Sequence, residues 1–261
     1  MFTNTFFSFL GVTCDSMSGS RTFRRVMKIY LTAIDMRGSL PSSIGNFQSI
    51  SNMLFYDTKI SGTIPSSIGA LTSLQSLIFV GNSLVGTIPS SIGGLTSLYW
   101  LIISRSRIGG SIPSSFGNLI LLNDLRLGGN ELTGSLPGNF SSLVVLKRLS
   151  IANNFLTGEI PSSFGRMTSL TQIVLNSNSL SGTIPSTMSA LTSLSYLDLQ
   201  SNYLTMGTAT SVPMATFSSY TLSSYSLNLE DNCLAFDTTS PYPYRHVTAT
   251  HCRSTSKYEI C

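Results

Sequence analysis

Charge is the scarcest property of this chain of 261 residues. Asp, Glu, Lys and Arg make up only 10% of the sequence, against roughly 25% in an average soluble domain. The net charge of +4 comes partly from a sparse basic cluster formed by Arg21, Arg24, Arg25, Lys28 and Arg37. A nucleic-acid-binding face needs a denser basic patch than this one. Nucleic acid is therefore excluded as the expected partner.

Long hydrophobic runs are absent as well. The apolar stretch from Phe6 to Val12 comes nearest to a membrane span, but it is far shorter than the roughly 20 residues that cross a bilayer. No basic residue precedes this stretch and no clear small-residue cleavage site follows it, so it makes a poor signal peptide. We expect no membrane anchor in this chain, and an N-terminus that is truncated or misassigned.

Histidine is rare enough to limit the possible chemistry. The two histidines, His246 and His251, lie beside Cys252, but the spacing lacks the second pair of ligands that a zinc site needs. No base stands beside a nucleophile or a paired carboxylate, and no glycine-rich loop of the phosphate-binding type is present. The sequence predicts neither a metal nor a cofactor, and it predicts a protein that is not an enzyme.

What the sequence has in abundance is a repeat of 24 residues. Each period carries a proline and, three residues before it, a glycine, and chance does not hold two such series in register over this distance. The prolines are Pro41, Pro65, Pro89, Pro113, Pro137, Pro161 and Pro185, and the glycines are Gly38, Gly62, Gly86, Gly110, Gly134, Gly158 and Gly182.

The apolar spacing changes within one period. Ile68, Leu71, Leu74 and Leu77 recur every three residues, which is typical of a 3₁₀-like turn, and Phe79 follows Leu77 by two residues, as in a strand. A single coil of this kind cannot enclose its apolar side chains, so the coils must stack. We predict eight repeats over residues 23–206, a partial N-terminal cap over 1–22, and a degenerate ninth repeat with a cysteine-containing cap over 207–261.

The repeated pattern LxxLxLxxNxLxGxIPxxIG resembles the plant-type leucine-rich repeat family, over roughly residues 11 to 234. Members of that family include polygalacturonase-inhibiting proteins and receptor-kinase ectodomains. The resemblance implies an α/β solenoid, namely a right-handed leucine-rich repeat superhelix with a parallel concave sheet and a 3₁₀ or irregular convex side. It also implies an extracellular or cell-surface recognition module.

Several polar residues follow the repeat and are interpreted as structural. An inward asparagine at the end of each strand segment satisfies the backbone of adjacent turns, and the ladder should be weaker where Ile34, Thr58 and Ser106 replace it. These asparagines are Asn82, Asn130, Asn154, Asn178, Asn202 and Asn232.

The cysteines and one asparagine bear on secretion. Cys14 lies in a segment, GVTCDS, that resembles the family's N-terminal cap but lacks its partner cysteine, so either the start is missing or Cys14 is free. We expect Cys233 and Cys252 to form a disulfide that closes the C-terminal end, in an oxidising compartment. Asn139 begins the only glycosylation sequon in the chain, Asn139-Phe140-Ser141.

The strand positions between the core residues should face solvent on the concave side, because strand side chains alternate. Apolar and aromatic side chains gather in the first half of this surface, and charged ones follow in the second half. Such a surface favours binding of a peptide or protein ligand, although a sheet also tolerates these residue types without a function. The predicted ligand-binding residues are Tyr30, Leu54, Tyr56, Ile78, Val80, Trp100, Ile102, Asp124, Arg126 and Arg148.

A second surface offers an alternative function. A row of small hydroxyl residues, one per coil, would suit an ice-binding face, although a second short strand with exposed β-formers explains the same row. A structural role in the extracellular matrix is a third possibility. The row consists of Ser39, Thr63, Thr87, Ser111, Ser135, Glu159 and Thr183, and Glu159 interrupts it.

Overall fold

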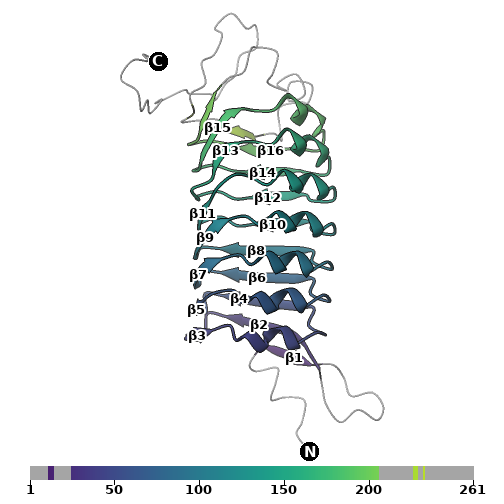
Figure 1. Cartoon of the computed structure of the whole chain (residues 1–261), viewed down its shortest axis with the longest axis vertical. Coiled ribbons are helices and arrows are strands. Elements are labelled where there is room, and N and C mark those ends of the chain that lie inside the picture. The colour runs from purple at the N-terminus through teal and green to yellow at the C-terminus, as the bar shows by residue number, and fades with distance from the viewer. Residues whose placement is uncertain (1–10, 15–24, 206–225, 229–231, 233–261) are drawn as a thin grey trace, which may run out of the picture.

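The computed structural model describes residues 11–14, 25–205, 226–228 and 232 of the chain. Within these residues the chain winds into coils that stack along one long axis, with strands on one side and short helices on the other (Figure 1). The predicted leucine-rich repeat solenoid is confirmed. The boundaries predicted for its caps and repeats stay a prediction, because much of both ends lies outside the described residues.

The concave side is a ten-stranded sheet, in the order β1-β2-β4-β6-β8-β10-β12-β14-β16-β18. Its first strand is antiparallel to β2, and every later pair is parallel. The strands are β1 (Val12–Cys14), β2 (Val26–Thr32), β4 (Asn52–Tyr56), β6 (Ser76–Val80), β8 (Trp100–Ser104), β10 (Asp124–Arg126), β12 (Arg148–Ser150), β14 (Gln172–Val174), β16 (Tyr196–Asp198) and β18 (Ser226–Asn228).

A second strand follows the concave strand in each coil, and these second strands form two further parallel sheets, β11-β9-β7-β5-β3 and β13-β15-β17. These strands are the second strand expected in each coil, and they account for the exposed hydroxyl residues on structural grounds alone. The strands are β3 (Gly38–Ser39), β5 (Ile60–Gly62), β7 (Ser83–Thr87), β9 (Arg107–Ser111), β11 (Glu131–Thr133), β13 (Thr157–Glu159), β15 (Ser179–Thr183) and β17 (Tyr203–Thr205).

A 3₁₀ helix closes each coil on the convex side and begins directly after the repeated proline. Pro89, for example, has φ −69° and ψ 142°, an extended conformation that the proline ring favours. The helix then ends when the backbone N–H of Leu95 donates to the carbonyl of Ile92. The helices are η1 (Ser42–Asn46), η2 (Ser66–Ala70), η3 (Ser90–Gly94), η4 (Ser114–Asn118), η5 (Gly138–Ser142), η6 (Ser162–Arg166) and η7 (Ser186–Ala190).

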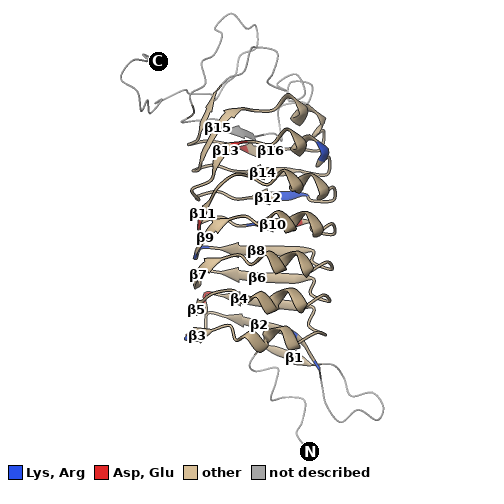
Figure 2. Cartoon of the chain, viewed as in Figure 1, with Lys and Arg blue, Asp and Glu red and all other residues tan. Residues whose placement is uncertain are grey.

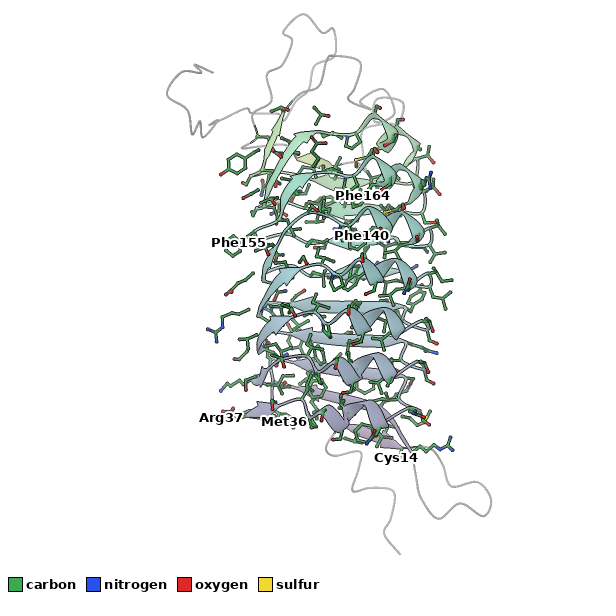
Figure 3. The ribbon with its side chains drawn as sticks, in the orientation of Figure 1. Cys14, Met36, Arg37, Phe140, Phe155 and Phe164 are labelled. Carbon is green, nitrogen blue, oxygen red and sulfur yellow. The ribbon has the colours of Figure 1, made fainter. Side chains whose placement is uncertain are left out.

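The core runs through the middle of the stack, and residues at equivalent positions of successive coils form columns in it. In one column the isoleucine of the early repeats gives way to phenylalanine, and the rings of Phe116, Phe140 and Phe164 stack with centroids 6.1 and 6.0 Å apart. Two of these rings are labelled in Figure 3. All three side chains are fully buried, so each coil buries its apolar surface against the coils above and below it.

The predicted asparagine ladder is present in the described coils. Asn154 is typical: its amide Nδ2 donates to the carbonyl of Leu127 in the preceding coil at 3.1 Å and to Ile151 in its own coil at 3.2 Å. The ladder therefore ties adjacent coils through backbone groups that would otherwise be unpaired and buried.

The acceptor side of the ladder reaches one coil back in every case. Oδ1 of Asn154 accepts from the backbone N–H of Leu132 at 3.0 Å, and Oδ1 of Asn178 accepts from that of Leu156 at 3.1 Å. Where Thr58 replaces asparagine, its buried hydroxyl donates to Oδ1 of Asn82 at 2.9 Å. A hydroxyl thus continues the ladder with fewer bonds than an amide makes.

Cys14 lies on β1 and is a free thiol among the described residues. The predicted disulfide partners Cys233 and Cys252 lie outside the described residues, as do both histidines. Asn139 lies exposed on η5, on the convex side of the solenoid. Its position therefore leaves the side chain accessible to a glycosylating enzyme.

Candidate ligand-binding face

The concave sheet brings the predicted ligand-binding residues onto one face, in straight columns across adjacent strands. One column pairs Trp100 with Asp124, and Asp124 with Arg148. The next runs Tyr30, Leu54, Ile78, Ile102 and Arg126, and a third pairs Tyr56 with Val80. The register follows from the buried residues between these positions, because shifting a strand by one residue would turn its leucines to solvent.

The first half of this face is apolar and accessible. Tyr30, Tyr56 and Trp100 are 40%, 41% and 40% exposed. The aliphatic residues between them are half-buried, because each is flanked by a neighbour on the next strand; they are Leu54, Ile78, Val80 and Ile102. We call these seven residues the concave patch.

Tyr99 extends this patch, although the sequence pattern did not point to it. Its ring meets the ring of Trp100 edge to face, with centroids 4.8 Å apart and an angle of 84° between the ring planes. Aromatic pairs prefer this geometry. The signal in the sequence was the adjacent pair of aromatic residues at the start of one strand, a pair that no other coil carries.

The prediction that Asp124 faces solvent is wrong in one respect. Asp124 lies on the concave face, but its side chain is only 2% exposed, because two arginines cover it. Arg126 donates to both carboxylate oxygens through Nε and Nη2, at 2.9 Å each, and Arg148 donates through Nε at 2.7 Å. The carboxylate therefore organises the arginines and is not itself available to a ligand.

This cluster keeps a net positive charge on the face beside the concave patch. The side chains of Arg126 and Arg148 are 45% and 40% exposed, so their remaining N–H groups face solvent. The hydrogen bond to Asp124 raises the pKa of Arg126 above its ordinary value. The two guanidinium groups thus present fixed donors for an anionic or carbonyl-bearing ligand.

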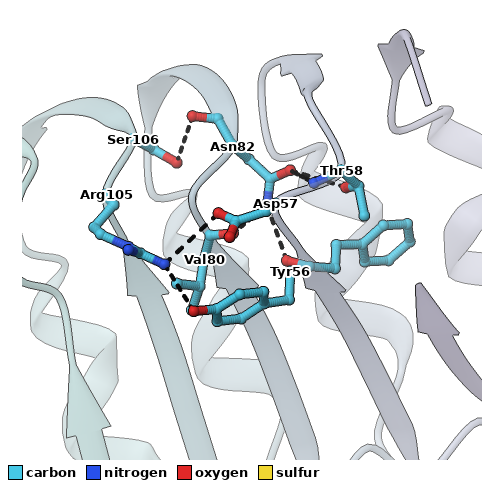
Figure 4. A network of polar contacts seen from close by, with 8 residues as sticks. Tyr56, Asp57, Thr58, Val80, Asn82, Arg105 and Ser106 are labelled. Atoms are coloured by element: carbon cyan, nitrogen blue, oxygen red, sulfur yellow. Dashed lines mark hydrogen bonds and ion pairs between the residues drawn. The ribbon is translucent and has the colours of Figure 1, made fainter. Parts of the chain in front are cut away.

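A second polar network lies at the end of the concave strands and was not predicted (Figure 4). Arg105 follows β8, and its Nη2 donates to the hydroxyl of Tyr56 at 3.0 Å and lies 3.6 Å from Oδ1 of Asp57. The guanidinium carbon also lies 5.5 Å from the centre of the Tyr56 ring. Arg105 therefore crosses an entire coil to reach a residue of the concave patch.

Gly81 makes this crossing possible. It occupies the coil between Asp57 and Arg105 with φ +65°, and a Cβ atom there would lie 1.7 Å from Oδ1 of Asp57 and 3.5 Å from Nη2 of Arg105. Any other residue would occupy the space through which these side chains meet. The glycine at position 81 is therefore the sequence feature that could have indicated this network.

The hydroxyl row lies on or directly after the second set of strands, away from the concave patch. Its members are exposed except for Thr183, which is half-buried. The glycine that precedes each member of the row has a positive φ, and in some coils a side chain would also clash: a Cβ on Gly86, whose φ is +79°, would lie 2.8 Å from the methyl group of Thr63. The row therefore packs against the next coil as well as facing solvent.

Two features interrupt this surface. Glu159 replaces a hydroxyl, as the sequence indicated, and a hollow of about 360 Å³ lies beside Thr87, lined by Gly109, Arg107 and Glu131. Gly109 has no side chain where adjacent coils carry Val85 or a threonine. The surface around the hydroxyl row is therefore less regular than the sequence repeat suggests.

The described residues hold no group of three or more His, Cys, Asp or Glu side chains placed to bind a metal ion. In the same part of the chain, none of the helices has the length and apolar character that crossing a membrane requires.

Two sequence models of leucine-rich repeats match the chain. One covers residues 144–204, and the other matches three single repeats at 73–95, 97–119 and 121–143. Together with the repeated fold, these matches place the chain in the plant-type leucine-rich repeat family. Comparison with the curated proteins found no match.

Solved structures of plant receptors resemble the chain over most of its length. The plant peptide hormone receptor RGFR1 in complex with RGF2 is 34% identical, with a TM-score of 0.74 over 80% of this chain and 32% of the receptor chain. The ectodomain of GASSHO1/SCHENGEN3 from Arabidopsis thaliana, in complex with CASPARIAN STRIP INTEGRITY FACTOR 2, is 30% identical, with a TM-score of 0.75 over 86% and 29%. The chain thus spans about a third of the length of these ectodomains.

A plant ice-binding protein is also similar in structure. It is 25% identical, with a TM-score of 0.67, and the match covers 86% of this chain and 69% of that chain. The identity is lower than for the two receptors, although the lengths correspond more closely.

Proposed function

We propose that the protein is an extracellular recognition module that binds a peptide or protein on the concave patch. The observation that carries this proposal is the continuity of the patch, in which aromatic and aliphatic side chains lie on four adjacent strands, β2, β4, β6 and β8. Exposed apolar patches of this kind mark interaction sites. The Arg126 and Arg148 guanidinium groups supply a polar border on the next two strands.

The structural relatives support a peptide ligand. Two of the receptor structures described above contain a bound peptide hormone or factor, and the leucine-rich repeat fold is typically a binding module and not an enzyme. We infer the same non-catalytic role here. The similarity to the ectodomain of a plant membrane receptor kinase supports an extracellular location.

Trp100 is the residue whose replacement tests this function. It is the only Trp in the chain, it lies near the middle of the face, and aromatic anchors of this kind commonly carry roughly 2 kcal/mol or more of binding free energy. A random linear peptide library displayed on phage is selected against the immobilised chain. One class of selected clones should bind Trp100→Ala at least about 30-fold more weakly than the wild type, as about 2 kcal/mol implies.

Phe155→Ala is the matched control, because Phe155 is 60% exposed and lies away from the concave sheet (Figure 3). This variant should retain the clones that Trp100→Ala loses. Both variants should unfold at nearly the temperature of the wild type, because exposed substitutions change stability by less than about 0.5 kcal/mol. The proposal is contradicted if no selected clone binds Trp100→Ala more weakly than the wild type.

Ice binding is the second candidate, and the similar plant ice-binding structure favours it. The hydroxyl row would be the surface involved, with Thr87 near its centre. Thr87→Arg should then reduce the inhibition of ice-crystal growth, which is measured by recrystallisation assays. If the unaltered protein has no effect on ice growth, this candidate is eliminated, and the interruptions at Glu159 and Gly109 explain why.

A further inference from the structure

The turn between each 3₁₀ helix and the next concave strand presents two residues to solvent. In four coils these residues are a threonine and a serine, but in two adjacent coils both are aliphatic. The hydroxyl pairs are Thr72-Ser73, Thr96-Ser97, Thr168-Ser169 and Thr192-Ser193, and the aliphatic pairs are Ile120-Leu121 and Val144-Val145. We call these four aliphatic residues the edge patch.

The core does not require the edge patch. Ile120, Leu121, Val144 and Val145 are 56%, 51%, 50% and 39% exposed, whereas the leucines on both sides of each pair are fully buried. The turn has the same backbone hydrogen bond in both kinds of coil: Leu122 to Leu119 at 2.8 Å, as Leu74 to Leu71 at 2.9 Å. Aliphatic side chains are therefore exposed where the same turn elsewhere carries hydroxyls.

The two aliphatic pairs form one surface. Their coils are neighbours in the stack, since the strands that follow the two turns, β10 and β12, pair directly in parallel. The hydroxyl pairs of the adjoining coils border the patch on both sides. Contiguous exposed apolar side chains, rimmed by polar residues, mark interaction sites.

The charges around the edge patch have one sign. Lys147 directly follows this turn and Arg166 ends η6 in the next coil; both are exposed. Neither takes part in an ion pair among the described residues. Asp124, the acidic residue closest in sequence to either pair, is buried beneath two arginines. Figure 2 shows how few charged residues the solenoid carries, so this local excess of basic charge is not neutralised nearby.

We propose that the edge patch is a docking site for a partner protein that presents aliphatic side chains bordered by Asp or Glu. Charge complementarity selects this partner. A second copy of this chain would bring Lys147 and Arg166 close to their own counterparts across a two-fold axis, and like charges repel. A lipid surface would favour Trp, Phe and Leu on an amphipathic helix, whereas this patch has two short valines on a turn.

The test uses a variant that gives the edge the residues of the other coils, namely I120T/L121S/V144T/V145S. A random linear peptide library displayed on phage is selected against the full wild-type chain, and each clone is then measured on the variant. A class of clones should bind the variant at least tenfold more weakly than the wild type. These clones should be rich in Leu, Ile or Val together with Asp or Glu, and Lys147→Gln with Arg166→Gln should weaken them.

Trp100→Ala should leave this class of clones bound, which separates the edge patch from the concave patch, and Phe155→Thr should leave it bound as well. If the fourfold variant does not fold, Leu121→Ser and Val144→Thr are measured singly. The proposal is overturned if no clone depends on the edge, or if edge-dependent clones carry Lys or Arg. Two other results also overturn the proposal. One is binding of the wild type to phosphatidylserine vesicles that the fourfold variant abolishes, and the other is a wild-type dimer, seen by light scattering, that the fourfold variant abolishes.

Discussion

Arg105 donates a hydrogen bond of 3.0 Å to the hydroxyl of Tyr56, a residue 49 positions earlier in the chain. The guanidinium carbon lies 5.5 Å from the centre of the same ring, within the range of a cation–π contact. Two interactions therefore hold one ring of the concave patch in a single orientation. A fixed aromatic ring loses less conformational freedom when a ligand binds.

Arg105→Lys should weaken ligand binding with little effect on stability. Lysine keeps the charge but lacks the planar fork that reaches the hydroxyl of Tyr56 and covers the ring. Phage clones that depend on Trp100 should bind this variant several-fold more weakly, while the free energy of unfolding falls by about 0.5 to 1 kcal/mol at most. Arg107→Lys is the control, and equal binding by the two variants would refute the positioning role.

Asp124→Asn should destabilise the solenoid by about 1 to 2 kcal/mol. Breaking a fully buried ion pair costs more than this, but the partners Arg126 and Arg148 are partly exposed and regain water. Denaturant unfolding measures the change. Asp35→Asn is a suitable control, because Asp35 pairs with Lys59 and Arg37 at an exposed site and should contribute little. Equal effects of the two substitutions would show that burial of Asp124 adds nothing.

Asn154→Ala should cost at least about 2 kcal/mol. Its amide serves buried carbonyls of Leu127 and Ile151 and the N–H of Leu132, and each unpaired buried group costs roughly 1 to 3 kcal/mol. Asn176→Ala, one strand end further along, removes a half-buried amide outside the ladder and should change stability by less than about 0.5 kcal/mol. Urea denaturation of both variants decides whether the ladder position matters.

Asn139 should carry a glycan when the chain is secreted from a eukaryotic host. The side chain is exposed on η5, and the sequon Asn139-Phe140-Ser141 is complete. Mass spectrometry of the peptide that contains Asn139 provides the measurement, with Ser141→Ala as the unmodified control. An unmodified Asn139 in the secreted wild type would remove this support for an extracellular protein.

Cys233 and Cys252 should form a disulfide, while Cys14 and Cys261 remain unbonded to the solenoid. The bond would contribute on the order of 3 kcal/mol by restricting the unfolded chain. Peptide mapping under non-reducing conditions identifies the pairing. A linkage between Cys233 and Cys261 would contradict the assignment.

The repeat made the fold and the register of the concave sheet predictable from sequence. Leu77 and Phe79 must both be buried, so Ile78 must lie on the open face, and the same alternation places Trp100 and Ile102 in the next coil. Periodicity also identified the asparagine ladder, because one amide at a fixed position suits one fixed backbone geometry. These features depend only on neighbouring coils, which the sequence arranges in order.

The contacts made by long side chains could not be predicted in this way. The burial of Asp124 depends on the paths of two arginines, and the contact between Arg105 and Tyr56 depends on the empty position at Gly81. The edge patch was overlooked for a different reason: Ile120 and Leu121 lie among core leucines, and a leucine-rich run does not indicate by itself which residues are exposed. Comparison with the Thr-Ser pairs of other coils would have distinguished them.

The parallel strands of the concave sheet also set a measuring pitch for any ligand that crosses them. Neighbouring strands lie about 4.8 Å apart, so Leu54 on β4 and Ile102 on β8, which lie in one column two strands apart, are separated by about 9.6 Å. A polyproline II peptide advances about 3.1 Å per residue, and every third side chain therefore recurs at about 9.3 Å. An extended β peptide repeats each face at about 6.8 Å, which matches neither one nor two strand spacings, so we expect a ligand that crosses the sheet to repeat its contacts every three residues.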